Sequence, residues 1–140
     1  MVVLLDANII LNYLTNRNDP YTQDCVEIMN TCVAGKITPY IAFHSLSIIW
    51  YVLRKTHSED MRRKVLRNVC SIVNVASASR EQILDAIDRE DFRDFEDCLQ
   101  DKCAQMAEAD YIVTCNVKDF KNAEIPVLPP NQLLEIVKEL

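Results

Sequence analysis

The chain has 140 residues, 49% of them hydrophobic, and a formal net charge of −6. This length predicts one domain with a substantial core, and the negative charge argues against electrostatic wrapping of nucleic acid while allowing an acidic pocket for divalent cations. A basic leader and a long apolar run are both absent, so we expect no membrane span and a cytoplasmic protein.

The chain contains one glycine, Gly35, and two histidines, His44 and His57. Phosphate-binding loops of the Walker and dinucleotide-binding types need several glycines, which excludes both types. No G-x-S-x-G or Cys/His signature supports a nucleophilic triad. The six cysteines form no C-x-x-C pair, and we expect reduced thiols in apolar surroundings. Carboxylates are therefore the plentiful reactive groups.

The first predicted element is a strand from Val2 to Leu5 that ends directly in Asp6. In an open parallel sheet, ligands bind outside the carboxyl ends of the strands, so an acid at this point indicates a functional site. The alternative is that Asp6 or Asn8 only caps the helix that follows. A later stretch, Tyr111 to Phe120, also has an apolar strand followed by polar and acidic residues, and it favours a site.

Helical spacing of apolar residues predicts a helix from Tyr21 to Ala34, followed by a strand from Ile37 to Ala42. Residues Leu46 to Leu53 are apolar on nearly every side, which indicates a helix in the interior. A third strand is predicted from Ile72 to Val75. An amphipathic helix from Ser79 to Arg89 follows, and its residues expected to face the core are Ile83, Leu84 and Ile87.

Basic residues lie on and just before the helix predicted to start at Ser58. Such residues most often form a solvated face, but a cluster of them can also bind a phosphate backbone. The residues considered for RNA binding are Arg54, Lys55, Arg62 and Arg63.

The helix that begins near Asp94 has acids in its first turn, which complement the helix dipole. Its periodicity places Asp97 and Asp101 on a solvated side. Ala104 lies on the same side as Asp97, and a small residue there favours close packing instead. The opposite side carries the apolar residues expected to face inward, namely Phe95, Leu99 and Met106.

Strands and helices alternate to the end of the chain, where a strand at Val127–Leu128 precedes a helix that starts after Pro129. This order predicts a single-domain, three-layer α/β/α sandwich with a mostly parallel central sheet and right-handed connections.

Three motifs stand in order along the chain: Asp-x-Asn after the first strand, Asp-Phe-Glu-Asp with an alanine seven residues after its last acid, and Thr-x-Asn-x-x-Asp-Phe. Together they resemble the PIN domain family, and within it the bacterial and archaeal VapC toxins. Each motif is short, but their order and spacing extend the resemblance over essentially the whole chain.

The resemblance implies an endoribonuclease that uses Mg²⁺ or Mn²⁺ and forms the toxin half of a toxin–antitoxin pair. It further implies RNA as substrate, an antitoxin protein as partner and a homodimer. Hydrolysis of a phosphodiester by a metal-activated water fits a chain rich in carboxylates. The residues that match the family's catalytic and metal-binding positions are Asp6, Asp97, Asp119 and Asn116, with Glu96 as an acidic neighbour and Asn8 and Thr114 as supporting polar residues.

One departure from the family concerns the helix after the second strand, where Ile48 stands in place of the usual glutamate. Many relatives also have an aspartate where this chain has Asn116, so the pocket has two fewer negative charges, which should weaken metal binding. A PIN-fold protein that binds RNA or a protein without cleaving is therefore an alternative. An unrelated acidic α/β protein, such as a phosphotransfer receiver, is disfavoured because no central strand ends in an isolated phosphorylatable aspartate.

Overall fold

Strands and helices alternate along the chain in the computed structural model, which describes residues 1–140. The strands are β1 (Val2–Leu5), β2 (Thr38–Ala42), β3 (Asn74–Ala76), β4 (Tyr111–Val113) and β5 (Val127–Leu128). The α-helices are α1 (Ala7–Thr15), α2 (Thr22–Val33), α3 (Phe43–Leu53), α4 (Glu59–Ile72), α5 (Arg80–Asp88), α6 (Phe95–Met106) and α7 (Pro130–Lys138), with a short 3₁₀ helix, η1 (Val117–Phe120). None of these helices combines the length and apolar character that crossing a membrane requires.

The five strands form one sheet in the order β3-β2-β1-β4-β5, and every neighbouring pair is parallel. The central strand β1 pairs with β2 on one side and with β4 on the other, so that Val3 lies opposite both Pro39 and Tyr111. The chain builds outward from β1 to β3 and then returns to place β4 and β5 on the other side. The strand order therefore reverses between β1 and β4, which is where open α/β sheets bind ligands.

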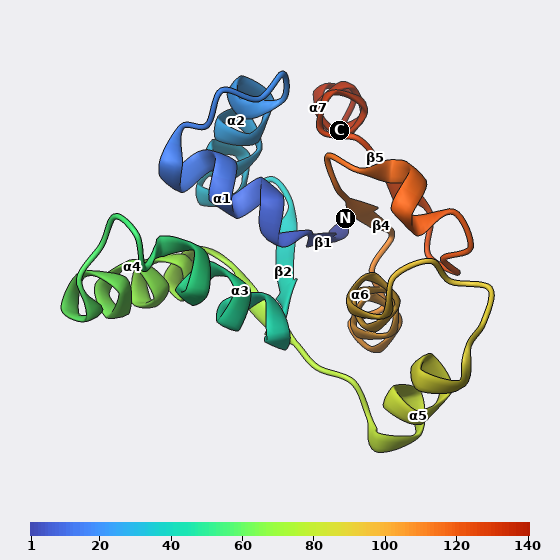
Figure 1. Cartoon of the computed structure of the whole chain (residues 1–140). Helices are drawn as coiled ribbons and strands as arrows, with labels where there is room; N and C mark the ends of the chain where they lie inside the picture. The colour runs from blue at the N-terminus through green and yellow to red at the C-terminus, as the bar shows by residue number, and fades with distance from the viewer.

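Both faces of the sheet are covered, as the alternation of side chains along β1 shows. Val3 and Leu5 belong to one hydrophobic cluster, with α1, α2, α3, α4 and α7, whereas Leu4 belongs to a second cluster, with α5 and α6. In Figure 1, α1, α2 and α7 lie above the sheet, and α5 and α6 lie below it. The predicted three-layer α/β/α sandwich is confirmed. All six cysteines have free thiols, but Cys70 is exposed rather than in apolar surroundings.

The expectation that α3 is buried on all sides is wrong. Ser45, Ile49 and Leu53 are buried, whereas the side chains of Phe43 and Tyr51 are 66% and 61% exposed. The helix packs chiefly against α1, α4 and the end of β2, and this packing leaves Phe43 and Tyr51 exposed.

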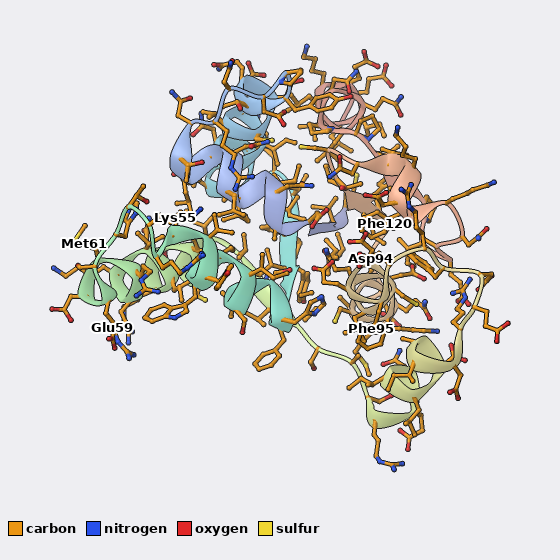
Figure 2. All side chains as sticks on the ribbon, in the orientation of Figure 1. Lys55, Glu59, Met61, Asp94, Phe95 and Phe120 are labelled. Carbon is orange, nitrogen blue, oxygen red and sulfur yellow. The ribbon has the colours of Figure 1, made fainter.

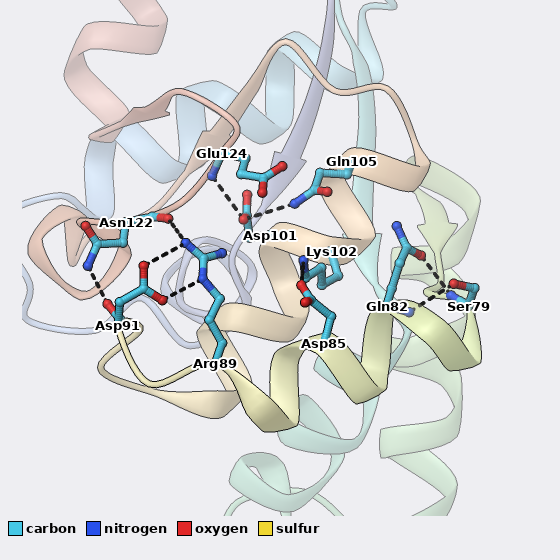
Figure 3. A network of polar contacts seen from close by, with 10 residues as sticks. All are labelled: Ser79, Gln82, Asp85, Arg89, Asp91, Asp101, Lys102, Gln105, Asn122 and Glu124. Carbon is cyan, nitrogen blue, oxygen red and sulfur yellow. Dashed lines mark hydrogen bonds and ion pairs between the residues drawn. The ribbon is translucent and has the colours of Figure 1, made fainter.

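The expectation that the apolar residues of α5 face the core is also wrong. Only Ala86 is buried, because α5 lies at the periphery and packs chiefly against α6. An ion pair between Lys102 of α6 and Asp85 joins the two helices (Figure 3). Ser79 and Gln82 form a capping box at the start of α5. The apolar residues left exposed are Ile83, Leu84 and Ile87.

The side of α6 expected to be solvated faces the interior. Asp101 and Ala104 are fully buried, as the alanine suggested, whereas Phe95 and Met106 are exposed. The carboxylate of Asp101 accepts hydrogen bonds from the backbone N–H groups of Glu124 and Ile125, at 3.0 and 3.1 Å, and from Gln105 Nε2 at 3.1 Å (Figure 3). Asp101 thereby fixes the segment before β5 on α6.

Replacing Asp101 with Asn should lower the free energy of unfolding by about 2 kcal/mol or more, because a single neutral amide oxygen would replace the buried carboxylate that accepts from two backbone N–H groups. Urea denaturation measures this loss. The control is Glu124→Gln, because Glu124 is exposed and contacts Asp101 only through its backbone. Equal stability of Asp101→Asn and wild type would contradict the structural role.

Candidate metal centre

The carboxylate of Asp6 lies at the carboxyl end of β1 and is 7% exposed. It accepts hydrogen bonds from Thr114 Oγ1 at 2.7 Å, from Gln100 Nε2 at 2.8 Å and from Asn8 Nδ2 at 3.1 Å. Although Asp6 occupies the N-cap position of α1, its side chain makes no capping hydrogen bond. The alternative that Asp6 is only a helix cap is therefore wrong.

The pairing of β1 with β4 places Thr114 next to Asp6. Leu5 lies opposite Val113, and the Asp6 N–H donates to the Val113 carbonyl at 2.9 Å, so the residues that follow both strands leave the sheet together. The supporting roles expected for Thr114 and Asn8 fit these contacts with Asp6.

Acids from the first turn of α6 form a cluster beside this strand edge. Asp94, Glu96 and Asp97 each offer a carboxylate oxygen, and these oxygens lie within 4.8 Å of one another. Asp94 also caps the helix, because its Oδ1 accepts from the Asp97 N–H at 3.1 Å. The same turn therefore begins the helix and gathers three carboxylates.

Two further side chains connect the acids. Gln100 Nε2 donates to Asp6 and also to Glu96, whose Oε1 and Oε2 lie 3.1 and 3.3 Å away. His44, in the first turn of α3, places Nε2 3.3 Å from Glu96 Oε1. Residues from β1, α3, α6 and the end of β4 thus meet at one edge of the sheet.

Burial and mutual repulsion shift the pKa values of these groups. Burial raises the pKa of Asp6 above its usual range. For Asp97, burial, a hydrogen bond to Glu96 and the negative charge of Glu96 raise the pKa to about 9. Burial would also raise the pKa of Glu96, but hydrogen bonds from His44 and Asp97 outweigh it and hold this pKa below its ordinary value. The pKa of His44 is raised to about 9, because hydrogen bonding to Cys103 and Glu96 outweighs the effect of burial.

These acids fit a hard divalent cation. Oxygen donors are the ligands that Mg²⁺ and Mn²⁺ take, and three carboxylate oxygens lie within 4.8 Å of one another here. A bound cation would offset the negative charge that these carboxylates bring together. Asp94, Glu96 and Asp97 are the residues placed to hold it, with Asp6 linked to them through Gln100.

The side chains of the two residues expected from the segment after β4 make no hydrogen bond or ion pair with these acids. Asp119, in η1, forms an ion pair with Arg93 at 3.6 Å and lines a hollow of about 430 Å³ together with Lys118. Asn116 is exposed, and its backbone N–H donates to Thr114 Oγ1 at 3.1 Å. A shared cation between Asp119 and the other acids stays a prediction.

The basic residues considered for RNA binding lie on the hairpin formed by α3 and α4. Arg54 stacks over Tyr51, with its guanidinium carbon 3.6 Å from the ring centre, and Arg62 stacks over Trp50 at 4.0 Å. Arg63 pairs with Glu59 at 2.8 Å. Figure 2 shows Lys55 and Glu59 on the α3–α4 hairpin at the left of the view, well away from Asp94 on α6.

Comparison with known families decides the classification. A model of the PIN domain matches residues 2–118, which include β1, α3, α6 and β4. The chain belongs to the PIN domain family. No curated protein matches it in sequence.

Solved structures share the PIN fold at low sequence identity. VapBC2 from Rickettsia felis, bound to a promoter DNA fragment, is 18% identical with a TM-score of 0.65, covering 92% of this chain and 98% of that one. VapBC-1 from nontypeable Haemophilus influenzae is 18% identical with a TM-score of 0.66, covering 94% and 99%. VapC20 from Mycobacterium tuberculosis, a toxin that cleaves the sarcin–ricin loop, is 13% identical with a TM-score of 0.59, covering 79% and 86%.

Sequence reasoning missed three residues of this PIN domain's acidic edge: Asp94, His44 and Gln100. Asp94 was interpreted only as the acidic start of a helix, although it belongs to the Asp-Phe-Glu-Asp motif. His44 is the second residue after β2, the strand next to β1, and that position was an available signal. Gln100 had no signal, because a single glutamine in a helix becomes informative only when its neighbours are known.

Replacing Asp97 with Asn should alter how stability depends on pH when EDTA removes metal. Asp97 binds its proton more tightly in the folded chain than in the unfolded chain, because its folded pKa is about 9. Its contribution to stability is therefore complete below its unfolded pKa of about 4 and is lost as the pH rises towards 9. Relative to wild type, the variant should gain a few degrees in melting temperature between pH 4 and pH 9.

The measurement is thermal unfolding over this pH range, with Asp60→Asn as control, because Asp60 is an exposed aspartate of α4. If the difference between Asp97→Asn and wild type is the same at every pH, the clustered-acid interpretation fails.

Proposed function

We propose that this PIN domain is a metal-dependent endoribonuclease that hydrolyses RNA phosphodiester bonds. The observation that carries the proposal is the meeting of Asp6 with the acidic first turn of α6 at the point where the strand order reverses. When bound there, Mg²⁺ or Mn²⁺ would supply a deprotonated water and neutralise charge on the phosphate.

The side chains of the site have separate roles in this proposal. Asp97 and Glu96 bind the cation, because their oxygens already lie close together. Asp6 completes the site, and Thr114 and Asn8 hold its carboxylate in a fixed orientation. Asn116 belongs to the catalytic residues in this proposal, and Asp119 would join the metal ligands once it leaves its ion pair with Arg93.

We further propose that the chain is the toxin of a toxin–antitoxin pair that acts on cytoplasmic RNA. Support comes from the shared fold with VapBC complexes and with a toxin that cleaves the sarcin–ricin loop. The partner in this proposal is an antitoxin protein.

The alternative is a PIN domain that binds RNA or a protein without cleaving. Two observations favour it. Ile48 packs against the hydrophobic core at the position of the family's glutamate, and the carboxylate of Asp119 is paired with Arg93. Both reduce the acids available for a metal.

Replacing Asp6 with Asn separates the two functions. Wild-type protein should cleave RNA only with Mn²⁺ or Mg²⁺, and the variant should lose about 100-fold or more in rate. At a Mn²⁺ concentration 100 times the Kd, wild type should gain about 2.7 kcal/mol of stability, and the variant should gain less. Asp60→Asn is the matched control.

RNA binding without metal-dependent cleavage by wild type would favour the non-cleaving alternative. A stability gain from Mn²⁺ that survives Asp6→Asn intact would remove Asp6 from the site.

We also propose a homodimer in which the basic α3–α4 hairpin of one chain extends the RNA-binding surface of the other. This hairpin lies well away from the acidic first turn of α6 in its own chain, as the positions of Lys55 and Asp94 in Figure 2 show. The exposed apolar residues of α5 offer a contact surface for pairing. The protein should sediment with the mass of two chains. Replacing Arg62 and Lys55 with Gln should weaken RNA binding and reduce its salt dependence, by about 0.7 in slope for each lost phosphate contact.

The control for RNA binding is Lys138→Gln, at the end of α7. A mass of one chain at micromolar concentrations would exclude the dimer, and an unchanged salt slope would exclude the hairpin from RNA binding.

A further inference from the structure

The helix α3 contributes an imidazole, and no carboxylate, to the acidic edge. Ile48 packs against the hydrophobic core, and His44, one turn earlier on the same face, reaches Glu96. This face of α3 therefore provides His44, which pairs with Glu96 of α6, and lacks the glutamate that PIN relatives usually have there. Another carboxylate must compensate if the site is to hold a cation.

Gln100 is placed to keep such a carboxylate in position. Its side chain is fully buried, and its amide nitrogen lies 2.8 Å from Asp6 Oδ1 and 3.1 Å from Glu96 Oε1. An amide NH₂ group has two hydrogens, so it can donate to both carboxylates at once. The contacts with Asp6 and Glu96 account for the whole donor capacity of this side chain.

The carbonyl oxygen of Gln100 is buried and has no hydrogen-bond partner. An unpaired buried acceptor lowers stability, so an apolar side chain of similar shape would suit a purely structural position better. The polar end of Gln100 is therefore explained by the two carboxylates that it contacts and not by packing.

The chemistry of an amide suits this position better than the alternatives. A lysine or arginine could also bridge Asp6 and Glu96, but it would add a further positive charge beside Glu96, which already pairs with His44. A glutamate would repel both. A glutamine brings the two carboxylates together without adding a charge of its own.

His44 holds Glu96 from the other side. Its Nε2 lies 3.3 Å from Glu96 Oε1 and 3.2 Å from the Glu96 backbone carbonyl. Contacts from α3 and from Gln100 together restrict the rotation of the Glu96 side chain, which is otherwise one-third exposed.

We propose that Gln100 and His44 are positioning residues that hold the Glu96 carboxylate beside Asp6, so that Glu96 supplies the acid that α3 lacks. This inference rests on the proposed metal-dependent function. Neither residue contacts the cation in this arrangement, and both act through Glu96.

The first test compares Gln100→Met with Gln105→Met, two similar changes on the same helix. Gln105 donates to Asp101, away from the acidic edge. Titration calorimetry with Mn²⁺ should show about 10- to 100-fold weaker binding for Gln100→Met, which is the usual effect of losing a group that orients a metal ligand. Gln105→Met should bind Mn²⁺ like wild type.

The second test uses His44, which is partly exposed and whose replacement therefore threatens folding less. His44→Leu should weaken Mn²⁺ binding, and His44→Gln, which keeps a hydrogen-bond donor, should recover most of it. A merely structural role would not distinguish these two variants in metal affinity once both are folded.

The outcomes separate this inference from the function on which it rests. Wild-type Mn²⁺ affinity in folded Gln100→Met, or equal affinities for His44→Leu and His44→Gln, would overturn the positioning role and leave the nuclease proposal in place. Absence of Mn²⁺ binding by wild-type protein would overturn both.

Discussion

The burial of one carboxylate, that of Asp6, is the constraint on which the rest of the site depends. A buried carboxylate is unfavourable unless hydrogen-bond donors surround it, and three side chains provide them here. The donors come from α1, α6 and the residue after β4. Satisfying Asp6 therefore requires the parallel pairing of β1 with β4 and the packing of α6 against the sheet. The position of the site follows from these two arrangements.

The cluster of carboxylates in the first turn of α6 is the part of the site that could bind a metal ion. Asp94, Glu96 and Asp97 are adjacent because the helix begins there, and the N-terminal end of a helix favours negative charge. Burial, a hydrogen bond to Glu96 and the negative charge of Glu96 raise the pKa of Asp97 to about 9. Bringing these carboxylates together lowers stability, which a bound ligand can restore. This balance is typical of functional sites.

The acidic edge contains no acid from α3, as the sequence predicted, because Ile48 stands where the family usually has a glutamate, with His44 one turn earlier. Asp119 is paired with Arg93. Glu96 compensates in our proposal, because Gln100 ties it to Asp6. Helix α3 begins at this edge with His44, whereas the arginines of the α3–α4 hairpin lie away from it. These arginines stack on Trp50 and Tyr51, an arrangement that keeps guanidinium groups ordered at a surface.

Periodicity and strand endings in the sequence were sufficient for the layered architecture and for Asp6. Alternation of apolar strands with helices leaves few topologies, and an acid directly after a buried strand has one location in a parallel sheet. Tertiary packing alone decided which side of α6 is inside. The amphipathic pattern favoured Phe95 and Met106, but the backbone N–H groups before β5 needed an acceptor, and Asp101 provides it. The same reason applies to Gln100. Its burial depends on hydrogen bonding to Asp6, which is distant in sequence, and the pattern of residues around Gln100 does not predict that contact.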